Sequence, residues 1–222
     1  MNAFLEQARF NMIEQQVRPW NVLDAEVLGL LSVVRREDFV PRGQEAIAFA
    51  DLEVPLGYGQ VMLAPRLEAR LLQDLAVQKA DKVLEIGTGS GFMSALLAHR
   101  AQHVYTLECR PALARMARES LHRNGIANAT VLEVSAAAGA LGLPAEEPFD
   151  VILLSGSVAE VPPALLGQLK IGGRLAAVVG EEPIMRARLY TRVGEAAWSQ
   201  TDLFDTVAPR LEGFAEPTRF HF

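Results

Sequence analysis

A short apolar segment that runs into a glycine-rich turn constrains this chain more than any other feature. Residues 82–86 read Lys-Val-Leu-Glu-Ile, and three glycines follow at alternate positions, Gly87, Gly89 and Gly91. Glycine tolerates positive φ, and because it has no Cβ a ligand can lie against its backbone. A helix-like segment begins after Gly91. The pattern therefore predicts a strand, a tight turn and a helix, with a ligand bound at the turn.

The spacing of the glycines restricts the kind of ligand. It is G-x-G-x-G, whereas dinucleotide-binding folds carry G-x-G-x-x-G, and no lysine follows as it does in the phosphate-binding loop of nucleoside triphosphatases. The spacing therefore disfavours both a dinucleotide and a nucleoside triphosphate as the ligand. The turn instead indicates a nucleotide-like ligand without a pyrophosphate.

The same residues carry a resemblance to a known family. Residues 83–91 resemble motif I of S-adenosylmethionine-dependent methyltransferases, and their full string, Val-Leu-Glu-Ile-Gly-Thr-Gly-Ser-Gly, is similar to that of the protein-L-isoaspartate O-methyltransferases. Further similar phrases lie at residues 39–41, 55–60 and 172–175, so the resemblance covers roughly residues 25–182. It implies an S-adenosyl-L-methionine cofactor and methyl transfer to a carboxylate of isoaspartyl-containing proteins or peptides.

Size and composition indicate one α/β domain. The chain has 222 residues, of which 22% are charged and 50% hydrophobic, typical of a globular protein. We expect one structural unit, with N-terminal helices and a substrate-side lid at 1–78 and the S-adenosylmethionine-binding core at 79–222. A single cysteine, the absence of an apolar run of the ~18 residues a membrane span needs, and the lack of a signal-peptide pattern predict a cytoplasmic protein. A net charge of −6 gives no support for nucleic-acid binding.

Apolar segments alternate with helical patterns from residue 82 onward. This alternation predicts a doubly wound, seven-stranded, mostly parallel sheet with helices on both faces. The last two strands follow each other without a helix, so we expect them to form an antiparallel hairpin at the sheet edge. The expected strands lie near 82–86, 103–108, 129–134, 149–154, 173–179, 185–192 and 200–207, and the expected helices near 91–100, 111–124 and 162–169.

The N-terminal third is expected to form a helical extension. Helical spacing of apolar residues predicts an amphipathic helix over residues 2–17, and Asp24 is placed to cap a second helix. The charged run 35–38 is interpreted as a solvated edge. Residues 51–65 predict an ordered lid or pocket wall, and a further helix is expected from Pro65 to about Ala76.

Cofactor-binding candidates must come from the carboxyl ends of the strands, where ligands lie in open α/β sheets. Glu85 is expected to orient the amino-acid end of the cofactor, although an acid bonded to the turn amides is an alternative. Glu108 ends the second strand about 20 positions after the first glycine, the interval at which an acid reaches a ribose in such folds. The turn residues that would offer backbone groups to the methionyl and ribose portions are Gly87, Thr88, Gly89, Ser90 and Gly91.

The adenine contacts are harder to assign. The family that the chain resembles has a glycine-aspartate-glycine phrase after its third strand, and this chain has Glu133-Val134-Ser135 instead. Ser135 is the candidate to supply a hydroxyl there. Cys109 either packs beside the adenosine or is a small buried thiol. Asp150 precedes the fourth strand and is expected to be structural, at the opposite end of the sheet.

The acceptor side carries one departure from the family. A Thr-Ile-Ser-like segment, whose serine is associated with activity, corresponds here to Val61-Met62-Leu63, and Leu63 cannot donate a hydroxyl bond. The substrate-side candidates are Gln60, Met62, Leu63 and Ser155, and no catalytic residue is assigned. Three interpretations stay open: an isoaspartyl methyltransferase with altered residues, a family member acting on another, small or apolar acceptor, and a cofactor-binding protein without isoaspartyl repair activity that acts through a partner.

No histidine is placed as an evident general base, and no metal site is expected. The four histidines are His99, His103, His122 and His221. Their positions disfavour methylation of a neutral hydroxyl or amine, which must lose a proton. A carboxylate acceptor is already ionised near neutral pH and needs no such base.

Overall fold

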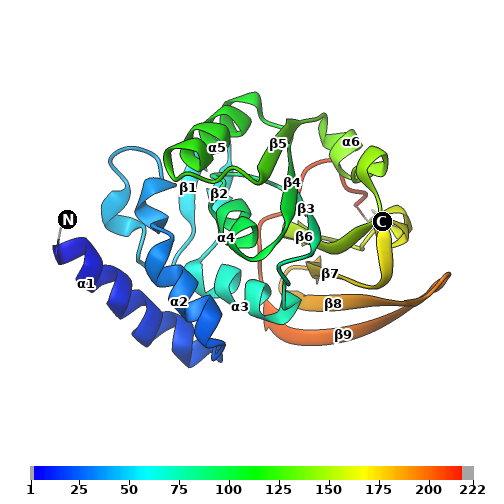
Figure 1. Ribbon diagram of the computed structural model, residues 1–222, viewed down its shortest axis with the longest axis horizontal. Coiled ribbons are helices and arrows are strands. Elements are labelled where there is room, and N and C mark those ends of the chain that lie inside the picture. Colours follow the sequence, from blue (N-terminus) through cyan, green and yellow to red (C-terminus); the bar gives the residue numbers. More distant parts are fainter. Residues whose placement is uncertain (1–2, 217–222) are drawn as a thin grey trace, which may run out of the picture.

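A seven-stranded sheet forms the centre of the protein (Figure 1). The computed structural model describes residues 3–216, and the sheet has the order β5-β4-β3-β6-β7-β8-β9. Strands β5, β4, β3, β6 and β7 run parallel, and β8 and β9 are antiparallel. The predicted doubly wound sheet with its C-terminal antiparallel hairpin is confirmed. The strands are β3 Lys82–Ile86, β4 His103–Glu108, β5 Ala129–Glu133, β6 Phe149–Val158, β7 Leu169–Glu181, β8 Ile184–Gly194 and β9 Ala197–Thr206.

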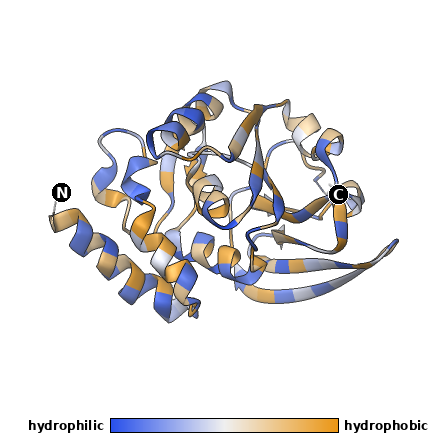
Figure 2. Ribbon diagram, viewed as in Figure 1, coloured by the Kyte–Doolittle hydropathy of each residue, from blue (hydrophilic) through white to orange (hydrophobic). Residues whose placement is uncertain are grey.

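Alternating side chains of the central strands fill two separate cores. Val83 on β3 and Val151 on β6 belong to one core, whereas Leu84 and Ile152 belong to the other. Successive side chains on a strand point to opposite faces, and a parallel strand covered on both faces is apolar throughout. By contrast, apolar and polar residues alternate along the β8–β9 hairpin (Figure 2).

Helices cover both faces of the sheet unequally. The three longer helices contribute to the first core, on the same face as the N-terminal extension, whereas a short helix and the residue that follows another one, Ala140, contribute to the second core. The longer helices are α3 Pro65–Leu75, α4 Phe92–Arg100 and α5 Pro111–Arg123; the short ones are α6 Ala136–Gly139 and α7 Pro163–Gly167. Within residues 3–216, no helix is long and apolar enough to cross a membrane.

The N-terminal extension packs against α3 and α4, at the opposite side of the molecule from the β8–β9 turn (Figure 1). Helix α1 spans Ala3–Met12 and continues as a π-helical turn over Ile13–Val17; residue 2 of the predicted helix lies outside the described part. Helix α2 spans Ala25–Val33, and its predicted cap is confirmed, because Asp24 Oδ1 accepts a hydrogen bond from Glu26 N at 2.8 Å. Short 3₁₀ turns lie at Arg18–Trp20, Arg36–Asp38, Glu45–Ile47 and Pro144–Glu146.

The interpretation of residues 35–38 as a solvated edge was wrong. The Arg36 side chain is 1% exposed and forms an ion pair with the buried Glu68 carboxylate. Its guanidinium also donates to the carbonyl oxygens of Ala48, at 2.8 Å, and of Leu63, at 2.6 Å. A buried charge is tolerated when it is paired and hydrogen-bonded, and these partners lie too far along the chain for a local pattern to reveal them.

The lid segment is ordered, as expected. Residues 51–65 contain a two-stranded hairpin, β1 Val54–Gly57 and β2 Gln60–Met62, rather than an irregular wall. Tyr58 and its two flanking glycines all have positive φ, which allows the tight reversal between the strands. The hairpin delivers Leu63 to the start of α3.

The segment after β9 returns across the carboxyl ends of the central strands. Two antiparallel steps give β9 the same direction as β7, so the chain leaves β9 at the edge where the parallel strands end. Ser157 N donates to Pro209 O at 2.7 Å, and Leu211 N donates to Ser157 O at 2.9 Å. Residues 207–216 therefore form a wall over this edge of the sheet, which the sequence analysis did not predict.

Candidate cofactor and acceptor site

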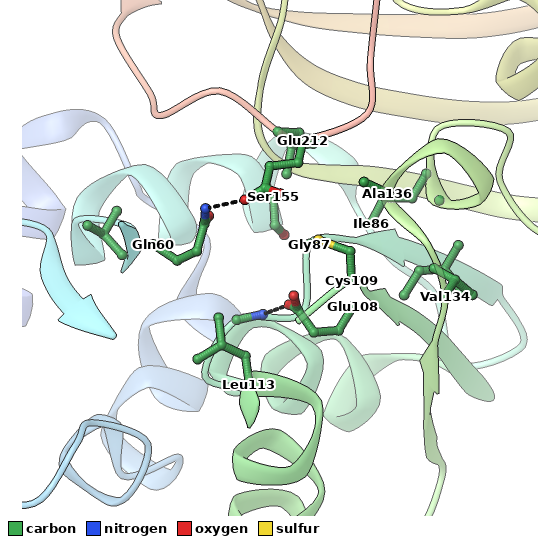
Figure 3. Close-up of a pocket in the computed structure, with 15 residues that line it drawn as sticks. Gln60, Ile86, Gly87, Glu108, Cys109, Leu113, Val134, Ala136, Ser155 and Glu212 are labelled. Carbon is green, nitrogen blue, oxygen red and sulfur yellow. Dashed lines mark hydrogen bonds between the residues drawn. The ribbon is translucent and has the colours of Figure 1, made fainter. Parts of the chain in front are cut away.

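A pocket lies at the carboxyl edge of β3, β4, β5 and β6, between the lid and the C-terminal segment (Figure 3). Its lining combines the glycine turn, the ends of these strands and two residues from the segment after β9. The lining residues are Gln60, Val61, Ile86, Gly87, Gly89, Leu107, Glu108, Cys109, Leu113, Val134, Ala136, Gly139, Ser155, Leu211 and Glu212.

Two positions of the glycine turn, Gly87 and Gly89, line the pocket and have backbone conformations that favour glycine. Gly87 has φ +95° and Gly89 has φ +53°, in the left-handed region that other residues rarely adopt. A Cβ on Gly87 would also lie 2.8 Å from Leu211 Cδ2, which is too close for two carbon atoms. Gly91 plays a different part, since its α-carbon faces Ala117 of α5 and it does not line the pocket.

Glu108 ends β4 and lines the pocket beside the glycine turn. Glu108 is 5% exposed, and its carboxylate accepts a hydrogen bond from Gly89 N at 2.8 Å (Figure 3). It also accepts one from Arg110 N at 2.9 Å. Burial raises the pKa of this carboxyl, and the backbone amides partly offset the rise. A carboxylate has about four acceptor sites, more than these backbone amides use, so it can also accept a hydrogen bond from a hydroxyl group of a ligand.

Small and apolar residues form the end of the pocket beyond Glu108. Leu107, Leu113, Val134, Ala136 and Gly139 make up this wall, which suits a flat aromatic ring. The predicted Ser135 does not line it: Ser135 Oγ accepts a hydrogen bond from Ala138 N at 3.2 Å as the cap of α6.

A second, smaller cavity adjoins the pocket through Val61, Gly87, Gly89 and Ser155, which line both. We call it the inner chamber. Besides the residues that it shares with the pocket, it gathers five more of the predicted site residues, namely Met62, Leu63, Glu85, Thr88 and Ser90, and two that the sequence analysis missed, Glu68 and Met93.

Glu85 is held by hydroxyl groups from three different elements. Thr106 Oγ1 and Ser94 Oγ donate to Oε2, the former at 2.8 Å, and Ser155 Oγ donates to Oε1 at 2.7 Å. Burial raises the pKa of this carboxyl to about 7, although the three hydroxyls lower it. Ser155 therefore contacts Glu85 as well as the pocket, while Thr88 Oγ1 lies 2.6 Å from Thr106 Oγ1.

Three polar side chains meet at the mouth of the pocket. Gln60 Nε2 donates to Glu212 Oε1 at 2.9 Å (Figure 3). Arg110 Nε donates to the same oxygen at 3.1 Å. Glu212 thus joins the lid to the loop after β4. Sequence analysis missed Glu212, although the direction of the last strand was a signal that the following residues return to this edge.

The histidines lie elsewhere. His103 begins β4, and His99 and His122 lie in the last turns of α4 and α5, so none of the three lines either cavity. His221 lies outside the described residues. Among residues 3–216, no group of histidine, cysteine and acidic residues is arranged to hold a metal ion.

Comparison with known proteins places these features in one family. The family model described as Protein-L-isoaspartate(D-aspartate) O-methyltransferase matches residues 7–207. A protein-L-isoaspartate O-methyltransferase of Methanoculleus marisnigri is 40% identical over 172 residues, which cover 78% of this chain and 77% of that protein. A protein of the same name from Koribacter versatilis is 38% identical over 201 residues, covering 90% and 88% of the two chains.

A solved structure supports the fold. It is a Plasmodium falciparum chain assigned as a protein-L-isoaspartate O-methyltransferase, in complex with S-adenosyl-L-homocysteine. It matches with a TM-score of 0.77 at 19% identity and covers 94% of this chain and 98% of its own. At this identity the likeness concerns the fold. The family model and the sequence relatives go further: the chain belongs to the protein-L-isoaspartate (D-aspartate) O-methyltransferase family.

Proposed function

We propose that this protein transfers a methyl group from S-adenosyl-L-methionine to a carboxylate, with isoaspartyl residues of proteins or peptides as acceptors. The observation that carries the proposal is the Glu108 carboxylate, which ends β4 and faces a pocket floored by Gly87 and Gly89. This arrangement suits an adenosine, and it lies in a chain that belongs to a methyltransferase family. We also propose a cytoplasmic location, which the free thiol of Cys109 supports.

Each half of the site has a separate task in this proposal. Glu108 binds the ribose hydroxyls, the wall around Val134 and Ala136 packs against adenine, and Glu85 in the inner chamber orients the amino-acid end. The cofactor supplies an electrophilic methyl group on a sulfonium. The protein contributes position and shelter from water, because Leu211 and Glu212 cover the glycine turn and the mouth.

A carboxylate acceptor fits the residues around the two cavities. Their ionisable lining residues are Glu68, Glu85, Glu108, Cys109 and Glu212, and no histidine or lysine lines them within residues 3–216. An ionised carboxylate is a nucleophile that needs no proton removed. The lining therefore favours carboxylate methylation over methylation of a neutral hydroxyl.

One observation favours a second candidate function, methylation of a smaller or less polar acceptor. Leu63 is 6% exposed and lines the inner chamber with Met62 and Met93, where the family carries a serine-containing segment. An apolar wall supplies no hydroxyl to a peptide acceptor and favours an apolar contact instead.

The test incubates the protein with methyl-labelled S-adenosyl-L-methionine and an isoaspartyl peptide, with the matching aspartyl peptide as control. We expect base-labile methyl ester on the isoaspartyl peptide alone. Equal labelling of both peptides, or none, would reject the isoaspartyl acceptor. If the isoaspartyl acceptor is rejected, turnover on a panel of small carboxylic acids would support the second candidate function. No turnover on that panel would indicate a protein that binds the cofactor without methylating these acceptors.

A further inference from the structure

We propose that Glu68 is a cofactor-binding residue, which together with Glu85 binds the α-ammonium group at the amino-acid end of S-adenosyl-L-methionine. The inference rests on the proposed function, because it assigns a recognition role within the same site. It gives Glu68 a task beyond its ion pair with Arg36.

The position of Glu68 follows from the lid. Helix α3 begins directly after the β1–β2 hairpin, and Glu68 lies in its first turn, 4% exposed, with its side chain lining the inner chamber beside Glu85. The chamber joins the pocket at Gly87 and Gly89. When the ribose of a nucleoside binds Glu108, the substituent on its ribose can therefore pass the glycine turn and enter this chamber.

One carboxylate oxygen of Glu68 is available to a ligand. Oε2 is paired with Arg36 Nη1, and among residues 3–216 Oε1 has no hydrogen-bond partner. Arg36 cannot serve both oxygens, because its other donors bind the carbonyls of Ala48 and Leu63. Glu68 keeps a small exposed fraction, 4%, and lines the inner chamber.

The charges around the chamber do not balance without a cation. Arg36 contributes one positive charge, and Glu68 and Glu85 contribute two carboxylates that are both buried. Buried charges are costly unless paired, and burial raises the pKa of each of these carboxyls to about 7, with the charge of Glu68 raising that of Glu85 further. An ammonium group entering between them would pair locally with both carboxylates and favour their ionised forms.

The chamber also offers a donor to the carboxylate that accompanies this ammonium. Ser90 lines it, and Ser90 Oγ accepts a hydrogen bond from Phe92 N at 3.3 Å, which leaves the hydroxyl hydrogen to donate. The two acids and this hydroxyl together match a zwitterionic amino-acid end rather than a simple cation.

The experiment measures binding to the full chain by calorimetry, with three ligands that share the adenosine. S-adenosyl-L-homocysteine carries the whole amino-acid end, S-adenosyl-3-thiopropylamine keeps the amine without the carboxylate, and 5′-methylthioadenosine lacks both. Glu68→Gln keeps the size of the side chain and an oxygen for Arg36. We expect it to weaken the two amine-bearing ligands by about 10-fold or more and methylthioadenosine by less than about 2-fold. Glu119→Gln, on the exposed side of α5, is the matched control and should change none of them.

Other outcomes overturn the inference. Equal weakening of all three ligands would show that Glu68 only supports the packing of α3, and no weakening would show that it does not contact the cofactor. Loss confined to S-adenosyl-L-homocysteine would assign recognition to the carboxylate instead of the ammonium. If the unaltered protein bound no adenosyl ligand, the proposed function would fail with the inference, whereas binding without a selective loss rejects Glu68 alone.

Discussion

We infer from the resemblance of residues 61–63 to the family's serine-containing segment that Leu63 takes the place of a serine, and Leu63→Ser tests what this position contributes. The leucine side chain is 6% exposed and packs in the inner chamber with Met62 and Met93. Truncating a buried leucine costs about 2–5 kcal/mol in stability, including the cavity left behind. The chamber already adjoins the pocket, where water can enter, so we expect a loss at the lower end, about 2–3 kcal/mol.

The Arg36 contact should survive this substitution, because it is made to the Leu63 carbonyl oxygen. Leu63→Ala is the matched control, since it removes the same apolar contact and adds no hydroxyl. Urea denaturation should show similar destabilisation of both variants. Only Leu63→Ser should raise the rate of isoaspartyl peptide methylation above that of the unaltered protein. Equal rates for the serine and alanine variants would refute the reasoning that the hydroxyl is what this position lacks.

Three further predictions concern the charged groups of the site. Glu108→Ala should weaken S-adenosyl-L-homocysteine binding by about 1.5–3 kcal/mol in calorimetry, and an unchanged affinity would remove Glu108 from the site. Arg36→Met leaves the buried Glu68 carboxylate without its counter-charge, so urea denaturation at pH 8 should show a loss of about 3–5 kcal/mol, and a smaller loss at pH 6. The folded-state pKa values of Glu68 and Glu85 are raised from 4.5 to about 7, so the folded state binds protons more tightly and the free energy of unfolding should fall as pH rises across that window. The slope should be at most about 1.4 kcal/mol per pH unit per group and smaller in Glu68→Gln; stability that rises with pH there would contradict these shifts.

Local signals in the sequence were sufficient for the sheet and for the positions of the glycine turn and Glu108 in it. The expected strand at 82–86 matches β3, and the glycine turn lies where its alternate spacing indicated. These features depend on residues adjacent in the chain, such as an apolar run that must be buried on both faces and glycines that must adopt positive φ. Glu108 could be placed for the same reason, because it ends a strand whose direction the pattern fixes.

Features that depend on distant partners could not be predicted in this way. Arg36 looked solvated because its partners, Ala48, Leu63 and Glu68, come from three later segments. Ser135 looked available to a ligand, but its hydroxyl caps α6. The wall at residues 207–216 was missed although the predicted hairpin carried a signal for it, because its position follows only from combining the directions of β7, β8 and β9. The division of the chain at residue 78 stays a prediction.

The placement of the cofactor is the central claim, and a crystal structure of this protein with S-adenosyl-L-homocysteine tests it most directly. The account predicts the ribose hydroxyls on the Glu108 carboxylate, the adenine against Val134 and Ala136, and the amino-acid end in the inner chamber beside Glu85 and Glu68. An amino-acid end directed out of the mouth between Gln60 and Glu212, with the inner chamber holding only water, would contradict it.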